Sequence, residues 1–202
     1  MEGLNHLESL GLSDNRLTAI SLPTIIKYAN ASSLMHLDLS FNDLHDQGAK
    51  AIAQHFKHNN VALTFLDLCN CNLLCSDVSV ICQNLKTYPN SLDELYLSNN
   101  KIASTGAAEI CAYLASKVCI LSILDVSWNI IGDGGAVEFA QVLGQHNKSL
   151  VRLNLAANAI NDFGGQRLMD SIGFNTTLRE MILSQNNLAD KTGFVVAQVG
   201  DG

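Results

Sequence analysis

Proline and charge are both scarce in this 202-residue chain, and each scarcity excludes a class of protein. Only Pro23 and Pro89 occur, and no low-complexity linker divides the chain into separate domains. Charged residues make up 15% and hydrophobic residues 48%, which excludes an intrinsically disordered chain because enough apolar side chains are present for a core. We therefore expect one continuous folded array over residues 1–202.

Long apolar runs and an excess of basic residues are also missing. No run approaches the ~20 apolar residues that a membrane-spanning helix needs, and the first residues lack the basic and apolar segments of a secretory signal. Lys and Arg number 12 against 19 Asp and Glu, so the formal charge of −7 argues against a nucleic-acid partner. These absences predict a cytoplasmic protein that binds neither membrane nor nucleic acid.

No arrangement in the sequence is typical of an enzyme, a metal site or a cofactor site. Cys69, Cys71 and Cys75 are close in sequence, but alternation along a strand turns the first two thiols to opposite faces. The histidines show no metal-ligand spacing, and no Gly-x-Ser-x-Gly motif or phosphate-binding glycine loop occurs. Without a secretory signal the cysteines are expected to stay reduced. We predict a non-enzymatic protein without metal or cofactor.

One eleven-residue phrase recurs through the chain, Leu-x-x-Leu-x-Leu-x-x-Asn-x-Leu, with conservative replacements. Its seven copies are 27 to 29 residues apart, a period that predicts a solenoid whose repeats pack against their neighbours. The copies begin at Leu7, Leu34, Leu63, Leu92, Leu121, Leu150 and Leu178. Because Met1 lies too close to the first copy to leave room for a cap, we expect a fragment that lacks full terminal caps.

Within each copy the apolar pattern changes from that of a strand to that of a helix. In the fifth copy Leu124 and Val126 alternate with outward residues, which predicts a short strand, and Asn129 then turns the chain inward. A glycine six residues after the asparagine opens an amphipathic helix in four copies. These glycines are Gly48, Gly106, Gly135 and Gly164. We predict an α/β solenoid with a concave parallel sheet and convex helices, the last helix lying near residues 192–200.

The phrase, the period and the glycine before the helix resemble the ribonuclease-inhibitor type of leucine-rich repeat. This repeat type is also found in the Ran GTPase-activating protein, in innate-immune receptors and in leucine-rich-repeat subunits of ciliary axonemes. The resemblance implies a horseshoe of about seven repeats and a habit of binding macromolecules. It does not imply one activity.

Outward strand residues on the concave face form the most distinctive surface in the sequence. Asp38 and Asp67 should lie side by side, about 4.8 Å apart, where a basic partner would relieve their repulsion. The alternative, that both are simply solvated, stays open. Aromatic side chains flanked by charge are typical of binding hot spots. We predict a scaffold that binds a protein, one with a basic segment, on this face. The predicted contact residues are His36, Asp38, Phe65, Asp67, Glu94, Tyr96, Asp125 and Trp128.

Two other functions are compatible with the repeat. One is a structural subunit of a large assembly such as a ciliary axoneme, which would give the chain a cytoskeletal or ciliary location. The other is a GTPase-activating protein of the Ran-activating type, although Arg16 has no convincing match to that family's pattern and the chain ends without its acidic tail.

Overall fold

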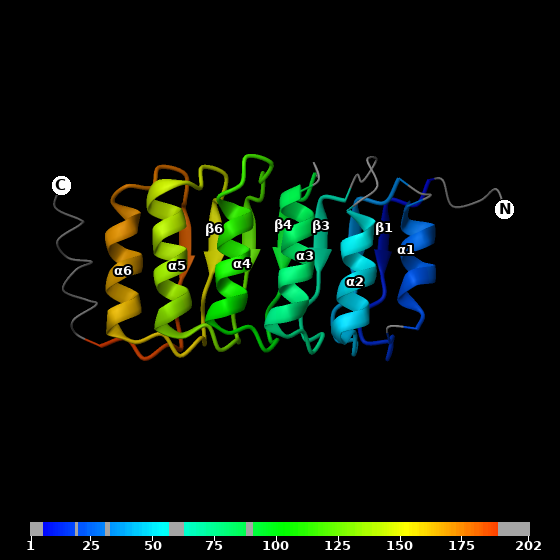
Figure 1. The fold of residues 1–202 in the computed structure, drawn as a ribbon, viewed down its shortest axis with the longest axis horizontal. Helices are drawn as coiled ribbons and strands as arrows, with labels where there is room; N and C mark the ends of the chain where they lie inside the picture. The colour runs from blue at the N-terminus through cyan, green and yellow to red at the C-terminus, as the bar shows by residue number, and fades with distance from the viewer. Residues whose placement is uncertain (1–5, 19, 31–32, 57–62, 88–90, 190–202) are drawn as a thin grey trace.

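Seven short strands form one parallel sheet in the computed structural model, and helices cover one side of it (Figure 1). The structure describes residues 6–18, 20–30, 33–56, 63–87 and 91–189. The strands are β1 (Ser9–Gly11), β2 (His36–Asp38), β3 (Phe65–Asp67), β4 (Glu94–Tyr96), β5 (Ile123–Asp125), β6 (Arg152–Asn154) and β7 (Glu180–Ile182). The helices are α1 (Leu22–Asn30), α2 (His45–His55), α3 (Cys75–Thr87), α4 (Ser104–Leu114), α5 (Gly132–Gln145) and α6 (Asp162–Ile172). Strand order follows the chain, so the predicted α/β solenoid is confirmed.

The core lies between the sheet and the helices and is built from the leucines of the phrase. Leu124 and Leu153 have no exposed surface, whereas Leu10 and Met181, in the outermost described strands, are only partly buried. Full burial of one such side chain contributes about 1.5–3 kcal/mol. Apolar residues one turn apart on the helices and at their ends also face this core, and all are buried except Ile172 of α6, which is half-buried. They are Ile52, Phe56, Ile81, Leu85, Ile110, Leu114, Phe139, Leu143, Leu168 and Ile172. Each repeat therefore closes the core of the previous one.

The asparagine of the phrase bonds the backbone of its own repeat and of the repeat before it. The Nδ2 of Asn129 donates to the carbonyls of Leu97, Val126 and Ser127, each at 3.0 Å, and its Oδ1 accepts the N–H of Ile102 at 3.0 Å. Only 6% of Asn129 is exposed, so these backbone groups have no access to water. Asparagines at the same position make similar bonds. They are Asn42, Asn100, Asn158 and Asn186.

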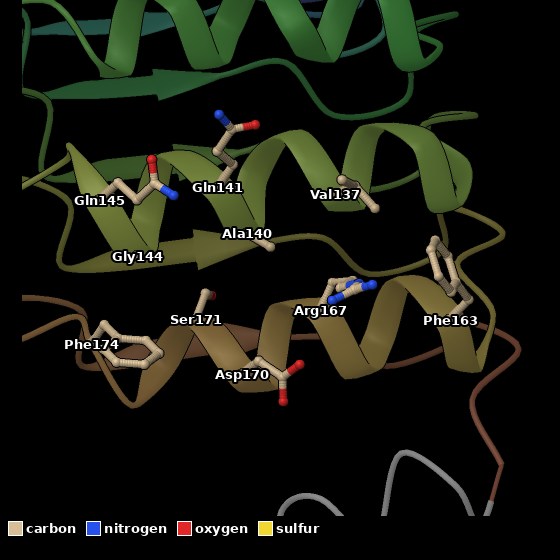
Figure 2. Close-up of a pocket in the computed structure, with 10 residues that line it drawn as sticks. All are labelled: Val137, Ala140, Gln141, Gly144, Gln145, Phe163, Arg167, Asp170, Ser171 and Phe174. Carbon is tan, nitrogen blue, oxygen red and sulfur yellow. The ribbon is translucent and has the colours of Figure 1, made fainter.

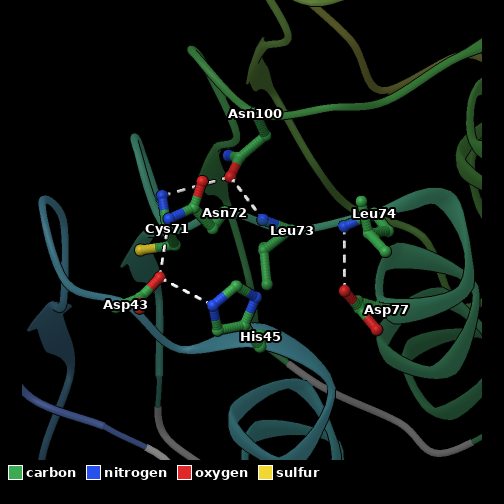
Figure 3. A network of polar contacts seen from close by, with 8 residues as sticks. All are labelled: Asp43, His45, Cys71, Asn72, Leu73, Leu74, Asp77 and Asn100. Carbon is green, nitrogen blue, oxygen red and sulfur yellow. Dashed lines mark hydrogen bonds and ion pairs between the residues drawn. The ribbon is translucent and has the colours of Figure 1, made fainter.

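The third repeat interrupts this asparagine ladder with a thiol, as Figure 3 shows. The buried Sγ of Cys71 lies 3.3 Å from the carbonyl of Leu39, a weak contact where an amide would donate. A thiol also offers no carbonyl oxygen to the repeat before it. The N–H of Leu44 accordingly turns to the carbonyls of Asn42, at 3.1 Å, and of Cys71, at 3.3 Å. The ladder continues at Asn100, whose Oδ1 accepts the N–H of Cys71 at 3.1 Å.

The helices begin two or three residues before the glycines that were predicted to open them. Gly106 is the third residue of α4, and a Cβ there would lie 2.8 Å from Cγ2 of Ile102 and 3.3 Å from Cα of Cys75. Glycine is thus needed because the first turn packs closely on its own strand turn and on the preceding repeat, not because it starts the helix.

The third repeat replaces this glycine by an acid. Asp77 in α3 is buried, and its Oδ2 accepts the N–H of Leu74 at 2.8 Å, which caps the helix start (Figure 3). The predicted helix near residues 192–200 lies outside the described residues. Among the helices that the structure describes, none combines the length and apolarity required to cross a bilayer.

Candidate functional site

The side of the sheet turned away from the helices is lined by outward-pointing strand residues, and we call it the sheet face. Strand pairing places residues that occupy the same position in successive strands beside one another, so that they form rows across the sheet. The first row contains Ser9, His36, Phe65, Glu94, Ile123, Arg152 and Glu180. The second row contains Gly11, Asp38, Asp67, Tyr96, Asp125, Asn154 and Ile182. Seven of the eight predicted contact residues belong to these rows, and Trp128 follows β5 in the next turn. Their contact with a partner stays a prediction.

The structure joins four of the predicted residues into one cluster over β2, β3 and β4. The rings of His36 and Phe65 are stacked, with centroids 5.3 Å and planes 14° apart, and the ring of Tyr96 lies 5.2 Å from that of Phe65. The Tyr96 hydroxyl donates to Oε2 of Glu94 at 2.7 Å. Because each ring and the hydroxyl are held by a neighbour, the cluster presents an ordered surface, which lowers the entropy lost on binding.

The acidic residues of the second row also complete the turns that end their strands. The Oδ1 atoms of Asp38, Asp67 and Asp125 each accept the backbone N–H two residues further on, at 2.8–2.9 Å. The hydroxyls of Ser40 and Ser127 donate to the same oxygens at 2.6 and 2.7 Å. Sequence reasoning missed this structural role, although the recurring Asp-x-Ser spacing is a signal for it. A substitution that removes the charge of one of these aspartates must therefore keep the Oδ1 atom as a hydrogen-bond acceptor.

Asp67 carries its charge in an unfavourable environment. Partial burial raises the pKa of its carboxyl, and the neighbouring charges of Asp38 and Asp125 raise it further, while hydrogen bonds from Cys69 oppose the shift. The repulsion expected from the sequence is therefore present on the sheet face. A cation bound near these carboxylates would favour the charged form of Asp67.

The end of the sheet face near β6 and β7 is closer to neutral. Nε of Arg152 lies 3.2 Å from Oε2 of Glu180, and Oδ2 of Asp125 accepts a hydrogen bond from Asn154 at 2.9 Å. The acidic excess is thus concentrated over β2–β5. Trp128 stands at the edge of this region with 58% of its surface exposed.

The first two of the three clustered cysteines diverge as the sequence predicted. Cys71 is buried in the core, whereas Cys69 is half-buried on the sheet face beside Asp67. Burial and the hydrogen bond with Asp67 raise the pKa of the Cys69 thiol to about 12, so it is a poor nucleophile and a poor metal ligand at neutral pH. Within the described ranges no group of three or more His, Cys, Asp and Glu side chains is placed to hold a metal ion.

A hollow that the sequence did not reveal lies on the helical side between α5 and α6 (Figure 2). Its volume is about 570 Å³, and its ends carry Phe163 and Phe174, which are 56% and 72% exposed. The guanidinium carbon of Arg167 lies 5.4 Å from the centre of the Phe163 ring. Only the packing of two neighbouring helices creates this hollow, which we call the helix groove.

Comparison with known proteins agrees with the architecture. A family model described as "Leucine Rich repeat" matches residues 30–53, 88–111, 119–140 and 146–169. Those segments recur in step with the strands and helices seen here. The fold is a leucine-rich-repeat solenoid. The ribonuclease-inhibitor subtype of the repeat stays a prediction.

Two solved structures resemble this leucine-rich-repeat solenoid. "Leiomodin-1 Actin-Binding Site 2 (ABS2)" is 17% identical with a TM-score of 0.59, and the match covers 74% of this chain and 88% of that one. The PEPR1–AtPEP1 crystal structure is 18% identical with a TM-score of 0.44, and the match covers 91% of this chain and 25% of that one. At such identities the similarity concerns the fold alone. A search of curated protein sequences found no match.

Proposed function

We propose that this solenoid is a non-enzymatic protein-interaction module that binds a basic segment of a partner protein on the sheet face. The observation that carries the proposal is the ordered His36–Phe65–Tyr96 cluster beside the acidic second row. Ordered aromatic rings supply contact area at low entropic cost, and the carboxylates supply charge complementarity to Lys and Arg.

The electrostatics favour a cation over other ligands. Asp67 is only partly buried and faces two further carboxylates, so adding a positive charge lowers the energy of the site whereas adding an anion raises it. The overall formal charge of −7 steers the same kind of partner toward the chain. A cytoplasmic protein with an exposed basic segment fits these features best.

Other functions have less support. The leiomodin-1 structure is an actin-binding site, but at 17% identity that similarity does not select actin as the partner of this chain. The assembly-subunit and GTPase-activating hypotheses stay predictions. For the latter, exposed Arg16 lies beyond β1 and away from the aromatic cluster over β2–β4, so no second feature of the site supports it.

The test is a titration with two synthetic peptides of equal length, one carrying Arg and Lys at alternate positions and the other Glu. The double variant Asp38→Asn, Asp67→Asn removes two charges but keeps the Oδ1 acceptors, as Asn154 shows by accepting the N–H of Ala156 at 3.1 Å. We expect binding of the basic peptide only, and about tenfold weaker binding by the variant, which corresponds to roughly 1.4 kcal/mol.

The matched control is Glu138→Gln, Asp170→Asn, which removes the same charge from exposed positions on α5 and α6. Its affinity for the basic peptide should fall far less, and its salt dependence should stay close to that of the unmodified protein. Equal losses in both double variants would reduce the effect to net charge and refute the sheet face as the site.

A further inference from the structure

In every repeat whose strand is described, the third residue after the strand lies in the left-handed region of the backbone map. Arg16, Asn72 and Ala159, each two residues further on, also lie there. The residues at the third position after each strand form a third row, which we call the left-handed row. Its members and their φ angles are Asp14 (54°), Phe41 (55°), Asn70 (52°), Asn99 (52°), Trp128 (55°), Ala157 (52°) and Gln185 (59°). The row borders the sheet face along its whole length.

The stacking of the repeats imposes this conformation. The N–H of Phe41 donates to the carbonyl of Cys69 in the next repeat at 2.8 Å, and the N–H of Trp128 donates to that of Ala156 at 2.9 Å. Asn and Asp tolerate the left-handed region, whereas bulky residues rarely adopt it. Asn70 and Asn99 follow that preference, but Phe41 and Trp128 do not.

Folding does not explain the two aromatic residues of the left-handed row. Phe41 is 54% exposed and Trp128 is 58% exposed, so neither is a core residue. Each comes three residues after an acid of the second row, Asp38 and Asp125 respectively. The sequence thus pairs an exposed ring with a carboxylate in the second and fifth repeats, on a face that already carries an acidic excess.

We propose that Phe41 and Trp128 are anchors for two arginine side chains of one extended partner segment. This inference rests on the proposed function and specifies the basic segment that binds. A guanidinium can lie flat on an aromatic ring while its N–H groups bond a carboxylate, which a lysine ammonium does less well. Asp38 and Asp125 supply those carboxylates within the same repeats.

The spacing of the anchors sets the spacing of the arginines. Phe41 and Trp128 are three repeats apart, which is about 14 Å at a strand separation of about 4.8 Å. An extended chain rises about 3.3 Å per residue, so the same distance spans about four residues. Residues i and i+4 of an extended segment point to the same side. The expected segment therefore reads Arg-x-x-x-Arg and runs across the strands.

Trp128 is the single tryptophan of the chain, so its fluorescence reports on this site directly. The probes are an Arg-x-x-x-Arg peptide, a second peptide with the arginines three residues apart, and a third with leucines in their place. We expect a saturable change in Trp128 emission with the first peptide and weaker binding of the other two. Equal binding by the leucine peptide would refute the assignment to arginine.

Variants then separate this inference from the proposed function. Phe41→Asn and Trp128→Asn should each bind a fluorescently labelled Arg-x-x-x-Arg peptide about two- to fivefold more weakly, the effect of losing one exposed cation–π contact. Their melting temperatures should be unchanged or higher, because Asn suits the left-handed backbone. Phe174→Asn, at an exposed ring of the helix groove, should bind like the parent.

The outcomes of the two proposals differ. Suppose that the double variant Asp38→Asn, Asp67→Asn binds the peptide more weakly, whereas Phe41→Asn and Trp128→Asn bind it like the parent. The arginine anchors are then refuted, and the proposal of a module that binds a basic segment stands. If no basic peptide binds the unmodified protein, both proposals fail.

Discussion

Restoring the missing amide of the asparagine ladder should stabilise the protein. In the neighbouring repeat, Asn100 accepts the N–H groups of Cys71 and Leu73 at 3.1 and 2.9 Å and donates to three carbonyls at 2.9–3.2 Å. At position 71 the thiol makes two weak contacts, at 3.3 and 3.4 Å, and the N–H of Leu44 has no side-chain acceptor there and bonds the carbonyls of Asn42 and Cys71 instead. The variant Cys71→Asn fits a position that the six other repeats already fill with Asn.

The magnitude follows from the bonds regained. A buried neutral hydrogen bond contributes about 0.5–1.5 kcal/mol net, and replacing the buried thiol offsets part of the gain, so Cys71→Asn should add roughly 1–2 kcal/mol. For a chain of this length that corresponds to a rise in melting temperature of roughly 2–8 °C. Thermal unfolding followed by circular dichroism measures it, and hydrogen exchange at the Leu44 amide should slow in parallel.

The reciprocal variant provides the control. Asn100→Cys introduces the same irregularity into the fourth repeat and should lower the melting temperature by a similar amount or more. If Cys71→Asn melts at or below the temperature of the parent, the asparagine would not be the source of the inter-repeat stability, and the ladder account would be wrong.

Three further predictions concern single residues. Asn129→Leu leaves the buried N–H of Ile102 without its partner and should cost about 1–3 kcal/mol in chemical denaturation. A loss below ~0.5 kcal/mol would contradict this. Asp67→Asn should melt at a higher temperature than the parent at pH 7, because a raised pKa means that ionisation of Asp67 opposes folding. This difference in melting temperature should vanish as the pH falls below about 4, and a difference that does not change with pH would refute ionisation as its cause. Burial raises the pKa of the Cys75 thiol, but hydrogen bonds from Thr105 and from the N–H of Ala103 outweigh this effect and lower that pKa. Cys75 should therefore be the first cysteine to react with a thiol reagent, and Cys75→Ser should remove the fast phase of that reaction.

The periodicity of the sequence was sufficient to predict the fold. Leu124 is fully buried, and Asn129 bonds its own repeat and the preceding one, because a solenoid places every copy of the phrase in the same environment. The helix starts were the error. The sequence predicts that Gly106 opens a helix, yet glycine is required there because a Cβ would come too close to Ile102 and to the preceding repeat. Such tertiary contacts cannot be deduced from the sequence of one repeat.

The candidate site was predicted less completely than the fold. Alternation placed Phe65 and Tyr96 on the outward side, but the ring contact between them depends on side-chain rotamers and crosses from one row to the other. A prediction from charge alone does not reveal the second function of Asp38, as acceptor for the turn after β2. The helix groove was missed because it arises from the fit of α5 against α6.

Mapping the bound Arg-x-x-x-Arg peptide by amide chemical-shift changes is the most direct test of where the partner binds. The sheet-face account predicts that the largest changes fall on residues 36–41, 65–70, 94–99 and 123–128, with little change along α5 and α6. Largest changes around Phe163 and Phe174, in the helix groove, would contradict it.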